Sequence, residues 1–138
     1  MQTDFLDAHE RHWDDAERLL EAQRWANADH LYGMAAECGL KLLMLRFGMP
    51  WDSAKDRPDN KQDIIHANGV WSRFEAYRRG HVDGAGYALS TSNSFHDWHI
   101  SQRYAHQLNF DQIRAQAHQR GANEVHKLVK RAQRDGLI

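Results

Sequence analysis

The chain of 138 residues contains a single cysteine, Cys38, and only two prolines, Pro50 and Pro58. One cysteine excludes an intramolecular disulfide and favours a reducing compartment, so we expect a cytoplasmic protein. Both prolines lie in GMPWDSAKDRPDN, residues 48–60, which marks one strong break in the chain. A second break is predicted at residues 80–94, where glycine and serine accumulate.

Long apolar runs and an excess of charge of one sign are also missing. Even the stretch LKLLMLRFGM is interrupted by Lys41 and Arg46, and no run approaches the roughly 20 residues that span a bilayer. The N-terminus, MQTDFLDAHERHW, is acidic and polar, so we expect no signal peptide and no membrane partner. A formal net charge of -1 gives no bulk attraction to nucleic acid. Any contact with RNA must therefore come from a local patch.

Motifs for the common cofactors and metal sites are absent as well. The sequence has no glycine-rich phosphate loop, no nucleophile elbow and no dinucleotide-binding fingerprint. It also has no zinc-protease signature and no set of cysteine ligands. We therefore expect neither a cofactor nor a resident metal ion.

The sequence does contain apolar residues at helical spacing. An apolar content of 41% with five tryptophans is enough for a buried core, and the apolar residues recur with the period of a helix rather than that of a strand. We predict an all-α fold, a four- to five-helix bundle in a single domain spanning residues 1–138. The expected helices cover approximately residues 4–23, 27–47, 60–80, 94–108 and 109–136. Thr3 or Asp4 is expected to cap the first helix and Gly48 to end the second, while Ile64 and Ile113 are expected on the apolar sides of the third and the last.

The segment 27–47 is predicted to be the central, most buried helix. It contains Gly33 and Gly39, each of which costs about 1 kcal/mol relative to alanine inside a helix, a cost that is tolerable where another helix packs closely. Glu37 and Lys41 lie four residues apart, a favourable spacing for an ion pair. They either occupy the one polar edge of this helix or pair while partly buried. We favour a surface pair and keep both as candidate binding residues.

Histidine is abundant, with ten residues, and it concentrates in FHDWHISQRYAHQLNF at 95–110. If 95–108 is helical, one stripe flanked by Tyr104 carries four polar side chains: His96, His99, Arg103 and His106. One interpretation is the solvent-facing side of a helix that its aromatic residues anchor. The other is a functional set, in which histidine moves protons near neutral pH and arginine holds a phosphate or an oxyanion.

A metal site is an alternative use of the histidines. His9 and His12 lie three residues apart, as do His96 and His99, and each pair can clamp one ion on a helix. The acidic side chains that could complete such a site are Asp29, Glu37 and Asp97. A His-rich, metal-binding helical bundle of the DinB-like kind is therefore one possible function.

Residues 16–44, AERLLEAQRWANADHLYGMAAECGLKLLM, resemble the opening of HEPN domains, in which one helix leads to a second of the type A-x-H-L-x-G-x-A-x-E-x-x-L-K. The matching residues are Ala28, His30, Leu31, Gly33, Ala35, Glu37, Leu40 and Lys41. Trp98, Arg103 and Tyr104, followed by a long last helix, are also similar to a HEPN arrangement. The resemblance touches most of the chain.

The resemblance implies a helical bundle that is often a homodimer. Many HEPN proteins are metal-independent ribonucleases with an R-x4–6-H motif near the start of the penultimate or last helix. Two copies of that motif meet across the dimer and activate the RNA 2′-hydroxyl. Other members bind RNA or a co-encoded protein in defence, toxin–antitoxin or immunity systems.

This chain departs from the R-x4–6-H motif. Arg103 and His106 occupy the expected place, but only two residues separate them. Two other pairs match the spacing. Arg24 with His30 spans the predicted turn between the first two helices, and Arg120 with His126 lies within the last helix, where Gly121 falls on its apolar seam.

We therefore expect a HEPN-like module that acts by binding a co-encoded protein or RNA, without catalysis. The first alternative is a ribonuclease in which Arg103 orients the phosphate and His106 or His99 is the general acid or base. His96 and Tyr104 are further candidate binding residues in this segment.

Overall fold

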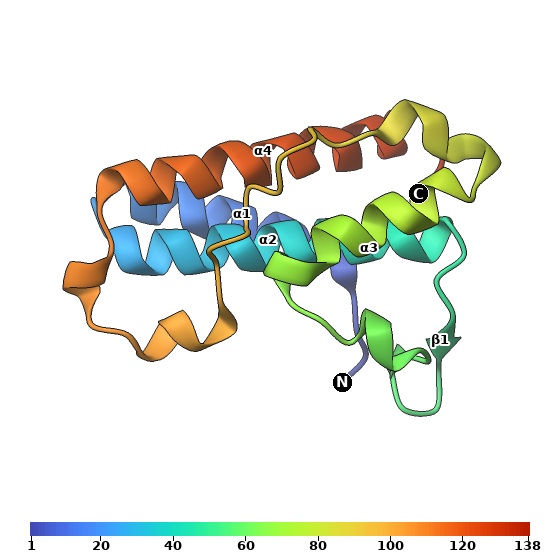
Figure 1. The fold of residues 1–138 in the computed structure, drawn as a ribbon, viewed down its shortest axis with the longest axis horizontal. Coiled ribbons are helices and arrows are strands. Elements are labelled where there is room, and N and C mark those ends of the chain that lie inside the picture. Colours follow the sequence, from blue (N-terminus) through green and yellow to red (C-terminus); the bar gives the residue numbers. More distant parts are fainter.

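The computed structural model describes all 138 residues and confirms the all-α bundle. Its four α-helices are α1 (Phe5–Glu21), α2 (Trp25–Arg46), α3 (Ala67–Arg79) and α4 (Gln112–Arg134) (Figure 1). The only sheet is a two-stranded antiparallel pair, β1 (Trp51–Asp52) with β2 (Arg57–Pro58). Short 3-10 turns complete the chain: η1 (Lys61–Asp63), η2 (Val82–Tyr87), η3 (Ile100–Tyr104) and η4 (Gln107–Asn109). None of the helices is long and apolar enough to cross a membrane.

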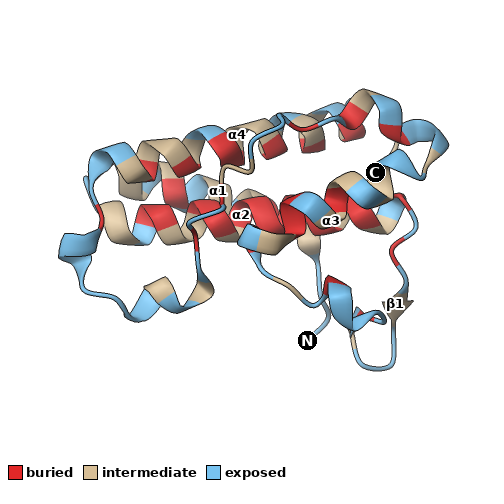
Figure 2. Ribbon diagram, in the orientation of Figure 1, coloured by how far each residue is buried: buried red, intermediate tan, exposed pale blue.

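Helix α2 forms the centre of the bundle, as its composition predicts. It packs against α1, α3 and α4, and Figure 2 shows buried residues along most of its length. An added Cβ at Gly33 would lie 2.1 Å from the Trp98 indole, and one at Gly39 would lie 2.7 Å from Val125. Gly39 therefore permits the close packing of another helix, α4, as predicted, whereas Gly33 accommodates Trp98 from a segment that is not helical. Cys38 is a buried core residue, and burial raises the pKa of its thiol to about 12.

The first two helices begin and end close to the predicted positions. Asp4 caps α1, because its carboxylate accepts hydrogen bonds from the backbone N–H groups of Leu6 (3.1 Å) and Asp7 (3.0 Å). Helix α2 ends before Gly48, whose φ of 95° lies in the left-handed region that glycine adopts readily. At its other end, α2 follows Arg24 and has no side-chain cap.

The predicted helix 60–80 begins only at residue 67. Asn60 caps the short turn η1 instead, and the buried carboxylate of Asp63 accepts hydrogen bonds from Arg73 (2.7 Å) and Tyr77 (2.6 Å). These bonds fold the start of the segment back onto the helix that follows. Ile64, which we predicted to face inward, is consequently 49% exposed.

The predicted helix 94–108 does not form, which leaves four α-helices rather than five. Its histidines explain why, since they cap short turns: His99 Nδ1 accepts the backbone N–H of Ser101, and His106 Nδ1 accepts that of Leu108, both at 3.2 Å. Helix α4 then begins at Gln112 rather than near Asn109. Ile113, predicted to lie on its apolar seam, is 77% exposed.

Candidate functional site

The structure does not assemble the predicted catalytic residues Arg103, His106 and His99. The Arg103 guanidinium lies over the ring of Tyr104, 4.8 Å from its centroid, and the two histidines cap different turns. All three are exposed, and no hydrogen bond or ion pair joins any two of them. His96 is also exposed, and its Nδ1 donates to the backbone carbonyl of Asn93 at 3.2 Å. The predicted stripe of three histidines and one arginine is therefore wrong.

Glu37 and Lys41 form a buried pair, so our interpretation of them as a surface pair is wrong. The Lys41 Nζ lies 2.8 Å from Glu37 Oε1, and their side chains are only 10% and 8% exposed. Glu37 Oε2 also accepts a hydrogen bond from His66 Nδ1 at 3.2 Å, which ties α2 to the start of α3. Glu37 lies about 18 Å along the helix from Trp25, at 1.5 Å per residue, and thus apart from the exposed residues of η3 and η4.

The metal-binding alternative has no ligand set in this structure. No group of three or more His, Cys, Asp or Glu side chains lies in an arrangement that could hold a metal ion. His9 is buried with both ring nitrogens occupied by protein partners, and His96 and His99 are exposed and bound to neighbouring residues.

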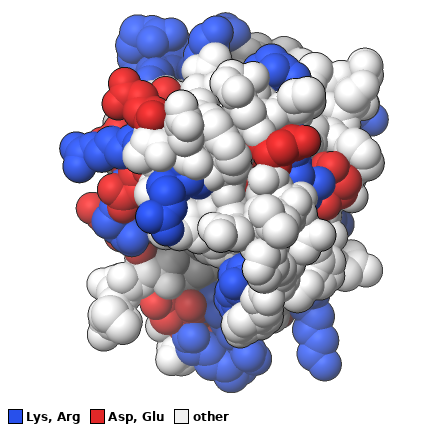
Figure 3. Space-filling model, turned by 90° about the vertical axis from the view of Figure 1, so that its left-hand side faces the viewer, with Lys and Arg blue, Asp and Glu red and all other residues white.

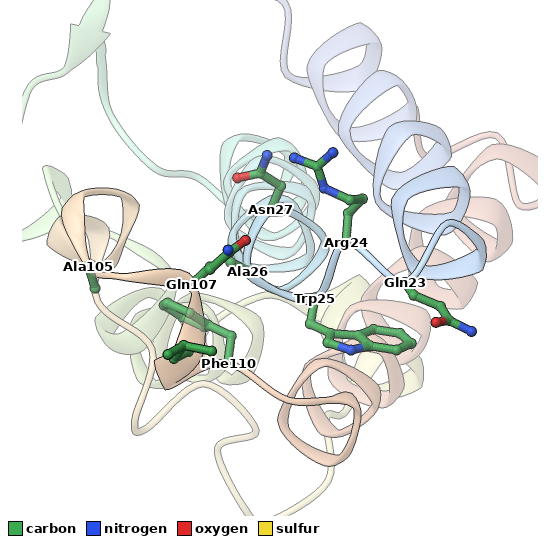
Figure 4. Close-up of a pocket in the computed structure, with 9 residues that line it drawn as sticks. Gln23, Arg24, Trp25, Ala26, Asn27, Ala105, Gln107 and Phe110 are labelled. Atoms are coloured by element: carbon green, nitrogen blue, oxygen red, sulfur yellow. The ribbon is translucent and has the colours of Figure 1, made fainter.

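The clearest concave site lies at the start of α2. A cavity of about 310 Å³ opens there between the α1–α2 turn and the segment around η4 (Figure 4). Its lining combines a guanidinium, amides and aromatic or aliphatic groups: Gln23, Arg24, Trp25, Ala26, Asn27, Ala105, Gln107, Leu108 and Phe110. The cavity can therefore accept both a flat apolar group and polar atoms.

The lining residues belong to two stretches without any acidic residue, 22–28 and 98–110, of which residues 23–27 and 105–110 border the cavity. Nineteen acidic residues among 138 would place about three in a stretch of this combined length, so the surface is locally cationic. We refer to the exposed residues of these two stretches as the acid-free surface. Figure 3 views this end of the molecule and shows Lys and Arg side chains around a broad uncharged centre, with Asp and Glu interspersed.

The charge of Arg103 reaches the first turns of α2. Burial, and next the charge of Arg103, lower the pKa of His30. The His30 ring stacks on Trp98 at 5.5 Å, and its buried Nδ1 has no hydrogen-bond partner. Arg103 and Arg24 therefore both contribute positive charge near the start of α2, while Tyr104 (77% exposed) and Leu108 (85% exposed) offer apolar contact area.

A buried ionic network holds the second stretch in place. His118 donates from Nδ1 to Asp29 and from Nε2 to Asp97 Oδ1 (3.0 Å), while Arg114 donates to Asp97 Oδ2 (2.8 Å). Gln102 donates to Asp29 as well. Burial alone would raise the pKa of Asp97, but the hydrogen bond and charge of His118, together with Arg114, lower it. The sequence had indicated Asp29 and Asp97 only as possible metal ligands.

Sequence reasoning missed His118 entirely. The spacing of Arg114 and His118 could have indicated the site. These residues are four positions apart and share one face of α4, and two basic side chains on one face imply acidic partners nearby. The partners come from α2 and from the segment after residue 94, which no local pattern identifies.

A second histidine centre joins α1 to α4. His9 Nδ1 donates to the backbone carbonyl of Ala35 at 2.7 Å, and His9 Nε2 lies 3.0 Å from His126 Nδ1. Burial is the main reason why the pKa of His9 is lowered to about 4, and burial with the charge of Lys130 lowers the pKa of His126. Trp13 stacks on His126 at 4.7 Å.

Trp13 also lines a cavity of about 350 Å³ beside this centre. The remaining lining residues are polar: Glu17, Gln119, Arg120 and Asn123. Trp13 therefore stacks on His126 and shares the lining of this cavity with Arg120, so it lies near both members of one of the two pairs with R-x4–6-H spacing.

No family model, curated protein or solved structure matches this chain.

Proposed function

We propose that this chain is a HEPN-like helical module that binds single-stranded RNA at the acid-free surface without cleaving it. The observation that carries the proposal is the cavity at the start of α2, lined by two stretches that lack acidic residues and carry arginine, aromatic and amide side chains. In keeping with the resemblance to HEPN domains, the proposed setting is a defence, toxin–antitoxin or immunity system.

Each kind of side chain on this surface has a counterpart in single-stranded RNA. Arg24 and Arg103 can pair with phosphate oxygens. Tyr104 and Trp25 present ring faces on which unpaired bases stack, an interaction worth about 1–3 kcal/mol per base. The amides of Asn27 and Gln107 can donate to and accept from base edges.

The state of the predicted catalytic residues supports the proposal of binding without cleavage. Arg103 lies over Tyr104, and His106 uses Nδ1 to cap its own turn, so neither is oriented by the other. A general base needs a free acceptor nitrogen. Because Nδ1 of His106 and of His99 already accepts a backbone N–H, each neutral ring carries its proton on Nε2, which donates rather than accepts.

Fluorescence anisotropy with a labelled 12-nucleotide oligo(U) or oligo(A) tests the proposal. We expect wild-type binding, a loss of affinity in Arg24→Ala, and no change in the matched control Arg57→Ala, which removes an exposed arginine from β2. Equal affinity in both variants contradicts the assignment. If the protein binds no RNA but forms a stable complex with a co-encoded protein, the acid-free surface is assigned to protein binding instead.

A second candidate function rests on the centre at His126. Because His9 Nδ1 donates to a carbonyl and its low pKa keeps the ring neutral at pH 7, His9 Nε2 must accept, and His126 Nδ1 must donate to it. The His126 Nε2 is thereby left as a proton acceptor of fixed orientation. We propose it as the alternative general base of a metal-independent ribonuclease, with Arg120 on the phosphate.

In that reaction Nε2 takes the proton of a 2′-hydroxyl, the 2′-oxygen bonds to phosphorus, and the 5′-oxygen leaves and takes a proton from water. Incubation with RNA in a chelator should then yield 2′,3′-cyclic phosphate ends. The activity should disappear in His126→Gln and persist in His106→Gln. Intact RNA, or cleavage that survives His126→Gln, eliminates this alternative.

A further inference from the structure

The network around His118 balances its charges only when that histidine is protonated. Two carboxylates, Asp29 and Asp97, face one guanidinium, Arg114, so a neutral His118 would leave an excess negative charge in a site where Asp29 is fully buried. Buried carboxylates without a partner are strongly unfavourable. The imidazolium supplies the missing positive charge.

The hydrogen bonds of His118 require the same state. Both ring nitrogens face carboxylate oxygens, which only accept, so both nitrogens must donate. The groups that surround the ring come from every neighbouring element: Asp29 from α2, Asp97 from the preceding segment, Gln102 from η3, Arg114 from α4, and the stacked ring of Phe95 at 5.2 Å. No other charged or titratable group forms a hydrogen bond or ion pair with the ring.

This network supplies the side-chain hydrogen bonds that hold residues 99–104 against the bundle, in addition to the apolar contacts of Trp98 and Ile100 with the core. Every side-chain hydrogen bond between residues 97–104 and helices α2 or α4 ends on Asp29, Arg114 or His118. Trp98 Nε1 reaches the backbone carbonyl of Asp29 at 3.2 Å, and Arg114 also donates to the carbonyl of Asp97 at 2.9 Å. Arg103 and Tyr104 follow directly and have no attachment of their own.

We propose that His118 is a positioning residue that holds the acid-free surface in its binding conformation, and that its protonation controls this docking. While His118 is charged, residues 99–104 stay docked on α2 and α4, next to the buried Trp98. As the pH rises and His118 loses a proton, one carboxylate loses its donor and the stretch is released. The role in RNA binding rests on the proposed function, whereas the docking itself does not.

Amide hydrogen exchange of the full chain tests the docking directly. After division by intrinsic exchange rates, protection of residues 99–106 in the wild type should fall at least tenfold from pH 6 to pH 9, while residues 36–44 of α2 serve as the internal reference. A protection of 99–106 that is independent of pH overturns the inference, as does a loss that affects 36–44 equally.

Asp97→Asn is the variant that separates positioning from general stability. Asp97 is half exposed, so its replacement leaves the core intact, and an asparagine amide can pair with His118 in either protonation state. We expect the pH profile of residues 99–106 to become flat in this variant. The control Glu10→Gln, which removes the ion pair with Lys130 between α1 and α4, should retain the wild-type profile. An unchanged profile in Asp97→Asn contradicts the inference.

Oligo(U) anisotropy then connects docking to function. Wild-type affinity should decline over the same pH range as protection does, and it should decline less in Asp97→Asn. Because His99 and His106 on the same surface also gain charge at low pH in both proteins, only the difference between the wild type and Asp97→Asn is attributed to His118. If the protein binds no RNA but shows the exchange profile, the proposed function fails and the positioning role of His118 stands.

Discussion

Gly33 and Trp98 are in direct contact: the indole of Trp98 occupies the space that a Cβ at residue 33 would need, with its nearest ring atom 2.1 Å from that position. Trp98 is almost fully buried, and its Nε1 donates to the backbone carbonyl of Asp29. Gly33 therefore leaves the space in which the Trp98 indole packs, and this packing holds the segment after residue 94 against α2.

Gly33→Ala should consequently destabilise the protein. A methyl group forces the indole or the helix to shift, an overpacking cost of about 1–3 kcal/mol that exceeds the gain in helix propensity. Gly69→Ala is the matched control, since an added Cβ there meets Ile65 at an ordinary 3.5 Å. Urea unfolding should give a lower midpoint for the first variant and an equal or higher one for the second. Equal midpoints would mean that the contact is not tight in solution.

The stability of the protein should fall on mild acidification because of His9. Its folded pKa of about 4 lies below the ordinary histidine pKa of 6.5, so the unfolded chain binds the proton first and stability is lost as pH falls from about 6.5 towards 4. From these two values, His9 should cost roughly 2 kcal/mol at pH 5 relative to pH 7. Urea midpoints at the two pH values measure the loss, which should shrink in His9→Gln and persist in His106→Gln.

The buried pair of Glu37 and Lys41 should respond strongly to the loss of one partner. Lys41→Met leaves the carboxylate of Glu37 buried beside His66 alone, which should cost about 3–5 kcal/mol. Lys130→Met breaks a pair whose side chains are 40% and 41% exposed, so it should cost less than about 1 kcal/mol. Thermal unfolding separates the two variants. Similar losses in both would show that the first pair is solvated.

Tyr104 should contribute to RNA binding through its ring rather than its hydroxyl. The side chain is 77% exposed and makes no hydrogen bond, so Tyr104→Phe should retain the affinity for oligo(U). Tyr104→Ala removes a stacking surface worth about 1–3 kcal/mol, which corresponds to roughly 5- to 150-fold weaker binding. Anisotropy titrations of the two variants measure the difference. Equal losses would assign the contribution to the hydroxyl, and unchanged affinity in both variants would place the tyrosine outside the site.

The fold could be predicted from the sequence where local patterns act alone. The apolar period of α1 and α2, the Asp4 cap and the stop at Gly48 are all decided within a few residues, and the structure agrees with each. The prediction of 94–108 as a helix was wrong because its histidines cap turns and because Phe95 and Trp98 are both drawn into the core. The helical period of the apolar residues does not reveal that turn capping and core burial compete with helix formation.

The candidate site was less predictable, because its parts come from distant segments. The cavity at the start of α2 joins residues about eighty positions apart along the chain, and the partners of His118 lie 89 and 21 residues away. Glu37 and Lys41 have the spacing of a surface pair, yet tertiary contacts bury them. Spacing within one helix predicts which side chains meet, whereas burial depends on the neighbouring elements.

The most direct test of RNA binding at the acid-free surface is the salt dependence of oligo(U) affinity. If Arg24 and Arg103 each neutralise one phosphate, log K should fall linearly with log[salt] with a slope of about −1.4, at about −0.7 per phosphate on a single strand. We predict that the double variant Arg24→Ala/Arg103→Ala loses both the affinity and this slope, while Arg57→Ala retains them. An oligo(U) affinity and slope that remain unchanged in the double variant would contradict the central claim.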